Sequence, residues 1–326
     1  MGFISTFPQP GGFFSASLPH DPTHLLRWAA VAMPEAVLAG AGHLPIGLKA
    51  GLVLNCRGVF IDPKTGGPIS WRPLESRLWQ AASRIGCLGA REVHPWGTIQ
   101  RFGWYMAEFH QVVAHELAAA VQQYGCRFIF LDEPAKEDAA GLARTLRLYG
   151  GLAGGKRAPI ITNGTFGPEE APGMVSGRFW QDLPNFYPET AVAETPEDYI
   201  GWCHGTPAHG TPAHGMTPEY LACLASIMGG PYQYTPTNGP FSYDWIPEPF
   251  APGSFGKPLA PRHQKGDVVG RIFENATLLV NVSRDRAASV PGLAGGQLPP
   301  LGWAVAWTEK MAPVAETGIR AEGAPV

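Results

Sequence analysis

The segment Cys126-Arg-Phe-Ile-Phe-Leu-Asp132 is the most apolar strand-like run of the chain, and the fold prediction starts from it. Gly125 precedes it and ends a predicted helix over residues 101–124, and a second predicted helix over residues 136–149 follows. A short apolar run between two helices is typical of a strand that is buried on both faces of a parallel sheet. Because parallel strands need crossover connections, the segment predicts repeated strand–helix units.

The same alternation continues on both sides of this segment. Apolar runs bounded by glycine or proline predict further strands over residues 3–7, 52–57, 85–93, 159–163 and 177–182. Further helices are predicted over residues 22–33, 196–202 and 218–228. The alternation predicts an α/β fold with a parallel sheet, and since no glycine-rich turn follows the first strand, we favour a TIM-type (β/α) barrel over an open nucleotide-binding sheet.

The C-terminal part of the chain has a different pattern. Two apolar runs, residues 276–281 and 302–307, look like strands of a small antiparallel unit. We therefore expect a barrel domain over residues 1–268, with a long proline- and aromatic-rich loop at 229–267. A small β-rich unit and tail over residues 269–326 would then form a C-terminal appendage.

Composition excludes several classes of function. The formal net charge is −3 and no Lys/Arg run is present, so no nucleic-acid partner is expected. No apolar stretch is long enough to span a membrane, and the N-terminus lacks the features of a signal peptide, so we expect a cytoplasmic protein without membrane partners. The five cysteines have no C-x-x-C spacing and are expected to be reduced.

Three motifs that resemble cofactor or metal sites are incomplete. His115-Glu116 lacks the second histidine of a zinc-protease motif, and the glycine-rich run before Lys156 is followed by Arg157 in place of Ser or Thr. A five-residue repeat places three histidines within residues 204–214, but its prolines and glycines provide no regular geometry for ligands. No cofactor or metal is therefore predicted, although the repeat leaves a metal-dependent hydrolase as a third, weaker hypothesis.

The candidate site follows from the ends of the predicted strands, where side chains of parallel α/β folds gather for function. Asp132 is the candidate nucleophile or base and Asp182 the candidate acid, with Glu133 as a substitute for either, because cleavage of a glycosidic bond needs two carboxyl groups. Aromatic rings stack on sugar faces, and amides and charged groups bind sugar hydroxyls. The candidate substrate-binding residues are Arg57, His94, Trp96, Asn163, Tyr232, Tyr234 and Trp245.

Four short motifs then point to a family. They are Ile129-Phe-Leu-Asp132, Ile160-Ile-Thr-Asn163, the pair Arg271-Ile-Phe-Glu-Asn275 and Val280-Asn281, and Pro299-Pro-Leu-Gly-Trp303. With them the chain resembles the glycoside-hydrolase-like (β/α) barrels that carry a small C-terminal β-unit, over about residues 48–308. The resemblance implies a barrel and a sugar-related site, with Asp132 and Asp182 as the candidates by position. The repeat and the aromatic loop have no counterpart in it.

Two main functions stay open at this point. The first is a glycosidase-type enzyme that acts on an oligo- or polysaccharide through paired carboxylates. The second is a non-catalytic structural or carbohydrate-binding barrel within a larger assembly such as a virus particle, which would bring partner subunits and a virion-associated location. The low content of charged residues, 16%, suits surfaces that neighbours cover.

Overall fold

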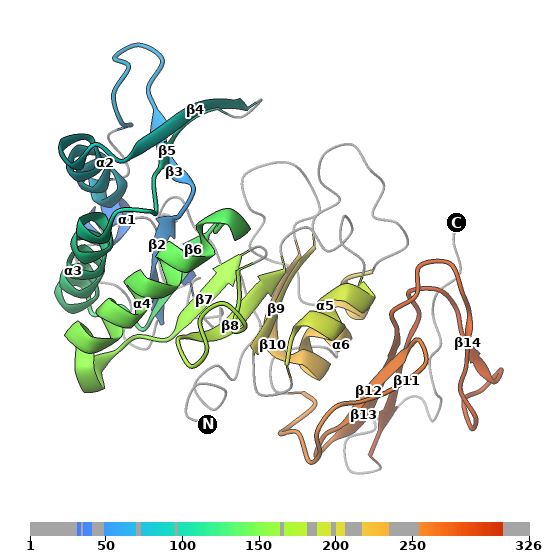
Figure 1. The fold of residues 1–326 in the computed structure, drawn as a ribbon. Helices are drawn as coiled ribbons and strands as arrows, with labels where there is room; N and C mark the ends of the chain where they lie inside the picture. Colours follow the sequence, from blue (N-terminus) through green and yellow to red (C-terminus); the bar gives the residue numbers. More distant parts are fainter. Residues whose placement is uncertain are drawn as a thin grey trace. The chain divides into compact units, whose positions relative to one another are not determined.

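The computed structural model describes ten stretches of the chain. They are residues 31–33, 35–40, 49–69, 73–94, 97–163, 166–180, 188–196, 200–205, 217–234 and 254–308. The chain divides into two compact units, with residues 13–179 in the first unit and residues 180–326 in the second (Figure 1).

The first unit is built on a parallel sheet. Its strands, in sheet order, are β1 (Val31–Met33), β2 (Ala50–Asn55), β6 (Phe128–Asp132), β7 (Ile160–Asn163) and β8 (Val175–Trp180), and each neighbouring pair is parallel. All six residues of β2 are buried. The predicted α/β fold with a parallel sheet is thus confirmed, including the strand at residues 128–132. Among the described residues no strand pairing closes this sheet on itself, so the barrel stays a prediction.

A layer of helices accompanies this sheet. The elements are α1 (Glu35–Gly40), α2 (Pro73–Ile85), α3 (Ala107–Tyr124), α4 (Ala139–Ala153) and the short 3-10 turns η3 (Lys136–Asp138) and η4 (Gly154–Lys156). Helix α3 packs against α2 and against α4. It ends at Gly125 as predicted, because Gly125 adopts the left-handed conformation (φ 62°) and donates its N–H to the carbonyl of Val121. Helix 22–33 was a wrong prediction at its end, since residues 31–33 form β1.

An antiparallel sheet is inserted between β2 and α3. Its order is β3 (Gly58–Ile61), β5 (Gly97–Phe102) and β4 (Leu88–His94). The strand predicted over residues 85–93 is therefore not part of the parallel sheet, and the exposure of most of β4 fits a hairpin and not a buried strand. The helix predicted from residue 101 begins only at Ala107. Phe102 ends β5, yet its ring lies 5.4 Å from that of Phe109 in α3, so the apolar spacing runs across the start of the helix.

The second unit begins with a parallel pair of strands. Its elements are α5 (Pro188–Glu194), β9 (Ile200–Gly205), α6 (Pro218–Met228) and β10 (Gly229–Tyr234), with β9 and β10 parallel. Helix 218–228 is confirmed, with the Thr217 hydroxyl accepting the Tyr220 N–H. The helix predicted over residues 196–202 was wrong at its end, because residues 200–202 belong to β9. Thr195, just before it, is buried and accepts a hydrogen bond from the Trp180 indole at 2.9 Å.

Residues 263–307 of the second unit form an antiparallel sheet. Its strands, in order, are β11 (His263–Lys265), β12 (Val268–Ile272), β13 (Ala276–Asn281) and β16 (Trp303–Trp307), and a separate pair joins β14 (Ala288–Ser289) to β15 (Gln297–Leu298). The segment predicted as a loop at 229–267 thus begins with a strand and ends with one, while residues 235–253 lie outside the described residues.

Helix α6 is buried on nearly all sides. It packs against β9 and β10 and also against β12, β13 and β16. Eight of its residues are at most 2% exposed: Tyr220, Leu221, Ala222, Cys223, Leu224, Ala225, Ile227 and Met228. A helix that is apolar all round requires partners on every face, and the buried side chains of α6 form one core with those of the antiparallel sheet. The predicted boundary at 268/269 stays a prediction. Among the described helices, none has the length and apolar character needed to cross a membrane.

Candidate functional site

Three polar residues stand in a row at the carboxyl edge of the parallel sheet. Asn55 ends β2, Asp132 ends β6 and Asn163 ends β7. Asn55 is paired in register with Asp132, and the β6–β7 register pairs Leu131 with Thr162, one residue before the ends of both strands. Because residues in register on parallel strands point to the same face, the three polar side chains share one face of the sheet.

The carboxylate of Asp132 is oriented from the side of β7. The Asn163 amide donates a hydrogen bond to Asp132 Oδ1 at 2.9 Å. The backbone of Asp132 is held from the other side, where its carbonyl accepts the Cys56 N–H at 2.8 Å. Asp132 is thus fixed between two neighbouring strands.

Glu133 follows directly and leaves the sheet in an unusual conformation. Its φ is 49°, in the left-handed region that glycine adopts easily and that costs other residues about 1–2 kcal/mol. The side chain turns toward β2, where the Asn55 amide donates to Glu133 Oε2 at 3.3 Å. Asp132 and Glu133, although adjacent in the chain, therefore contact different neighbours.

The environment of Glu133 favours its protonated form. Burial raises the pKa of Glu133 above its ordinary value, and the negative charge of Asp132 raises it further. The hydrogen bond from Asn55 and the positive charges of Arg57 and His94 act in the opposite direction without cancelling the rise. The two adjacent carboxyl groups thus differ in their surroundings.

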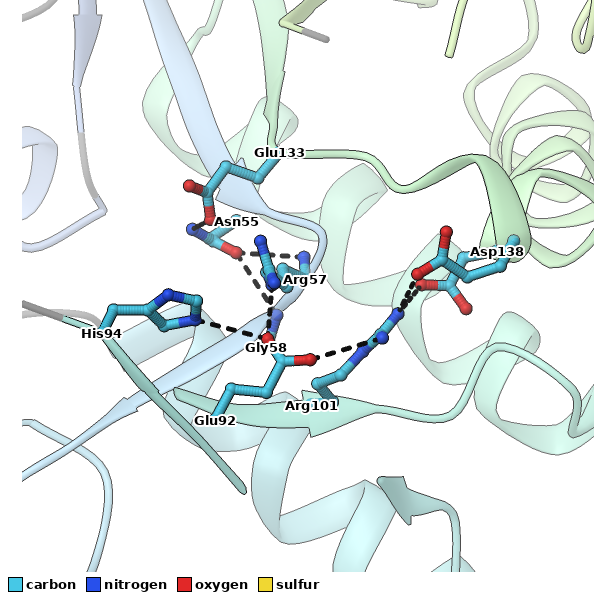
Figure 2. A network of polar contacts seen from close by, with 9 residues as sticks. Asn55, Arg57, Gly58, Glu92, His94, Arg101, Glu133 and Asp138 are labelled. Atoms are coloured by element: carbon cyan, nitrogen blue, oxygen red, sulfur yellow. Dashed lines mark hydrogen bonds and ion pairs between the residues drawn. The ribbon is translucent and has the colours of Figure 1, made fainter. Parts of the chain in front are cut away.

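A network of charged residues lies beside Glu133 (Figure 2). The Glu92 carboxylate of β4 lies between three cationic or protonatable groups, as Figure 2 shows: Arg57 Nε at 2.6 Å, His94 Nε2 at 3.3 Å and Arg101 Nη1 at 3.4 Å. Burial alone would raise the pKa of Glu92, but the bonds and charges of these partners lower it. Glu92 is therefore ionised and fixes Arg57, which follows β2, to the inserted sheet.

Arg101 continues the network to the segment after Glu133. Its Nη2 lies 3.0 Å from Glu137 Oε1 and 2.9 Å from Asp138 Oδ2, both in η3. Burial raises the pKa of Asp138 in spite of the positive charge of Arg101. One guanidinium thus joins the inserted sheet to the turn that follows β6.

The described residues bring together five of the predicted site residues. Asp132, Glu133, Arg57 and Asn163 lie at the carboxyl edge of the sheet, and His94 reaches the same region from β4. His94 was expected at the end of a parallel strand, and this was wrong, because β4 is antiparallel. The other predicted residues are outside what the structure describes: Asp182, Trp96 and Trp245 altogether, and the side chains of Tyr232 and Tyr234, whose backbone belongs to β10.

Three residues of the site were missed in the sequence. Asn55 carries a recognisable signal, since Leu54-Asn55 ends an apolar run in the same way as Leu131-Asp132 does. Glu92 and Arg101 carry none, because their role depends on the pairing of β4 with β5. Strand ends are visible in a sequence, whereas contacts made by an inserted hairpin are not.

Within the described ranges, no group of three or more His, Cys, Asp or Glu side chains is arranged to hold a metal ion. Most of the histidine repeat, residues 206–214, lies outside those ranges. The chemistry that the described site can perform is proton transfer and carboxylate attack. A carboxylate beside a carboxyl group with a raised pKa supplies a base or nucleophile and a proton donor.

Comparison with known proteins gives matches only among solved structures. No family model matches the chain, and no curated protein matches it. A cyclic α-maltosyl-(1→6)-maltose hydrolase from Arthrobacter globiformis has 12% identity and a TM-score of 0.47, with 93% of this chain and 92% of that chain covered. A GH27 β-L-arabinopyranosidase from Geobacillus stearothermophilus has 11% identity and a TM-score of 0.47, with 88% of each chain covered.

An α-amylase from Malbranchea cinnamomea is similar to the same degree. It has 10% identity and a TM-score of 0.47, with 97% of this chain and 99% of that chain covered. All three of these structures are glycoside hydrolases, the class that the sequence motifs resemble. At this level of similarity they assign no activity and no residue role to the chain.

Proposed function

We propose that this chain is a glycosidase-type hydrolase that acts on an oligo- or polysaccharide at the carboxyl edge of β2, β6 and β7. The observation that supports the proposal is the pair of adjacent carboxyl groups in unlike environments. Asp132 accepts from Asn163, whereas Glu133 is partly buried, has a raised pKa and turns to Asn55. Hydrolysis of a glycosidic bond needs one ionised and one protonated carboxyl group.

The roles follow from these environments. Asp132 acts as the nucleophile or the base, and its orientation by the Asn163 amide keeps the attacking oxygen in place. Glu133 donates the proton to the leaving oxygen, because its pKa keeps a larger fraction protonated near neutral pH than an ordinary glutamate has. Asp182 is a second candidate for the acid, and Arg57 and His94 are candidates for binding hydroxyl groups.

The test is turnover on a panel of oligo- and polysaccharides, measured as release of reducing ends. For a substrate that the wild type cleaves, Asp132→Asn and Glu133→Gln should each lower kcat by about 10²–10⁴-fold, the usual contribution of a positioned acid or base. Glu108→Gln, which changes an exposed carboxyl group at the start of α3, is the matched control and should keep full turnover. Full turnover in both site variants would exclude the assignment.

The alternative of a non-catalytic barrel makes a different prediction. It requires glycan binding without cleavage, and binding should then weaken when Arg57 or Asn163 is changed. Neither the described residues nor the matched structures named above support a place in a virus particle. The metal-dependent alternative requires that turnover stop when a chelator removes metal, whereas the carboxyl pair needs none.

A further inference from the structure

The charged network beside the site forms a continuous strap. Arg57 Nε contacts Glu92, Glu92 contacts Arg101 Nη1, and Arg101 Nη2 contacts Asp138, with the distances given above. We use the name strap for these four residues, Arg57, Glu92, Arg101 and Asp138. It runs from the end of β2 across the inserted sheet to η3, as Figure 2 shows.

The strap holds both sides of Glu133. On one side Arg57 follows Asn55, whose amide binds the Glu133 carboxyl group and whose Oδ1 accepts the Arg57 N–H at 3.0 Å. On the other side Asp138 is only five residues beyond Glu133 in the chain, and the intervening Pro134 is buried. Residues 133–138 are thus held at one end by the hydrogen bond from Asn55 and at the other end by the ion pairs of Arg101.

A fixed segment is what the backbone of Glu133 requires. Left-handed φ values at residues other than glycine persist only where the surroundings enforce them. The single hydrogen bond from Asn55, at 3.3 Å, is long for this task. The two contacts from Arg101 to η3 are shorter, at 3.0 and 2.9 Å. In the Arg101–Asp138 pair the two side chains are only 21% and 14% exposed, so solvent screens this pair less than a surface pair.

We propose that Glu92 and Arg101 are positioning residues that hold residues 133–138 in place, so that the Glu133 carboxyl group stays beside Asp132. Neither needs to touch a substrate. The catalytic part of this inference rests on the proposed function, but the positioning part does not, and it can be measured in the absence of any substrate.

The experiment compares Arg101→Met and Arg101→Lys in the full chain. The control is Arg91→Gln in β4, whose guanidinium binds Gln100 and the Gly66 carbonyl in the same inserted sheet. Hydrogen exchange of the peptide that covers residues 133–138 should be about tenfold faster in Arg101→Met, the factor that corresponds to about 1.4 kcal/mol of lost local stability. Lysine reaches one carboxylate but does not bridge three, so Arg101→Lys should recover part of the protection.

The pKa of Glu133 can be measured from carboxyl ¹³C resonances in a pH titration. The direction in which it changes when Arg101 is replaced distinguishes a positioning role of Arg101 from a purely electrostatic one. If Arg101 acts by position, its loss opens the segment to water, and the raised pKa of Glu133 falls toward the ordinary value. If Arg101 acts only as a nearby positive charge, its loss raises the pKa further. A rise, an unchanged value, or equal effects in Arg91→Gln would each overturn the inference.

Turnover separates this inference from the proposed function. With a cleavable glycan, Arg101→Met should lower kcat by about tenfold or more with little change in KM, since misplacement of a catalytic group by about 1 Å can cost 10²-fold. If no glycan is cleaved by the wild type, the proposed function fails. The exchange and titration results then still decide whether the strap positions Glu133.

Discussion

Glu133 offers a direct test of the strained turn at the site, through the pair of variants Glu133→Gly and Glu133→Ala. Both remove the carboxyl group, so their difference reports the backbone alone. At φ 49° an alanine has a conformational penalty of about 1–2 kcal/mol that glycine does not have. Glycine in turn lowers the free energy of unfolding by about 0.4–1 kcal/mol, because its unfolded chain has more conformational freedom. The glycine variant should therefore be more stable by roughly 0.8 kcal/mol.

The assay is urea unfolding monitored by circular dichroism. The two variants are fitted with one common m-value, so that their midpoint concentrations give the difference in the free energy of unfolding. Gly125→Ala is the internal standard, because Gly125 has a φ of 62° at the end of α3 and should lose a similar amount. An alanine variant as stable as the glycine variant, with Gly125→Ala behaving as expected, would refute the left-handed conformation at Glu133. Both variants should lose turnover to the same degree, because both lack the carboxyl group.

Three further perturbations test the structure. Relative to Glu133→Gln, wild type should lose unfolding free energy as the pH rises from about 4, the ordinary glutamate pKa, through the raised pKa of the folded state, because this carboxyl group ionises first in the unfolded chain; a flat difference in urea titrations would contradict the raised pKa. Arg77→Met should destabilise by about 2 kcal/mol, because it removes both guanidinium bonds from the 3% exposed Glu35 carboxylate. The loss should be smaller than for a fully buried pair, since Arg77 is 41% exposed and Glu35 keeps the hydrogen bond from the Tyr124 hydroxyl; thermal unfolding that shows no change would count against it. Gly51→Ala should cost about 1–3 kcal/mol, since the new Cβ would overlap the Phe128 ring, and adding Phe128→Leu should recover part of the loss in a double-mutant cycle.

The parallel sheet was predictable because its signals are local. The run at residues 128–132 and the run at 160–163 are short and apolar and end in a polar residue, and both are strands of the parallel sheet. Helix α6 was equally visible, since Thr217 and Pro218 form a start signal and Gly229 adopts a positive φ at its end. Where the sequence was read correctly, the interactions that decide the structure lie within a few residues.

The inserted sheet could not be predicted in the same way. Arg101 and Phe102 continue an apolar spacing that reads as helix, but the pairing of Phe102 with Leu88 in β4 overrides it. The strap has the same origin, because Glu92 meets Arg57 only after β3, β5 and β4 have assembled. Such contacts join residues that are far apart in the chain, and no local pattern encodes them.

Both the backbone conformation of Glu133 and the environment of its side chain are unfavourable, and this favours a chemical role for its carboxyl group. Its backbone is left-handed, and its partly buried side chain has a raised pKa beside Asp132. Leu301 of the second unit has a similar φ of 51°, but its apolar side chain is only 5% exposed, so hydrophobic burial offsets the strain there. The hydrogen bond that Glu133 accepts from Asn55 is long, at 3.3 Å, and a glycine would remove both penalties. A strained residue without compensating packing is typical of a site where the side chain itself is needed, which favours a chemical role for Glu133 over a structural one.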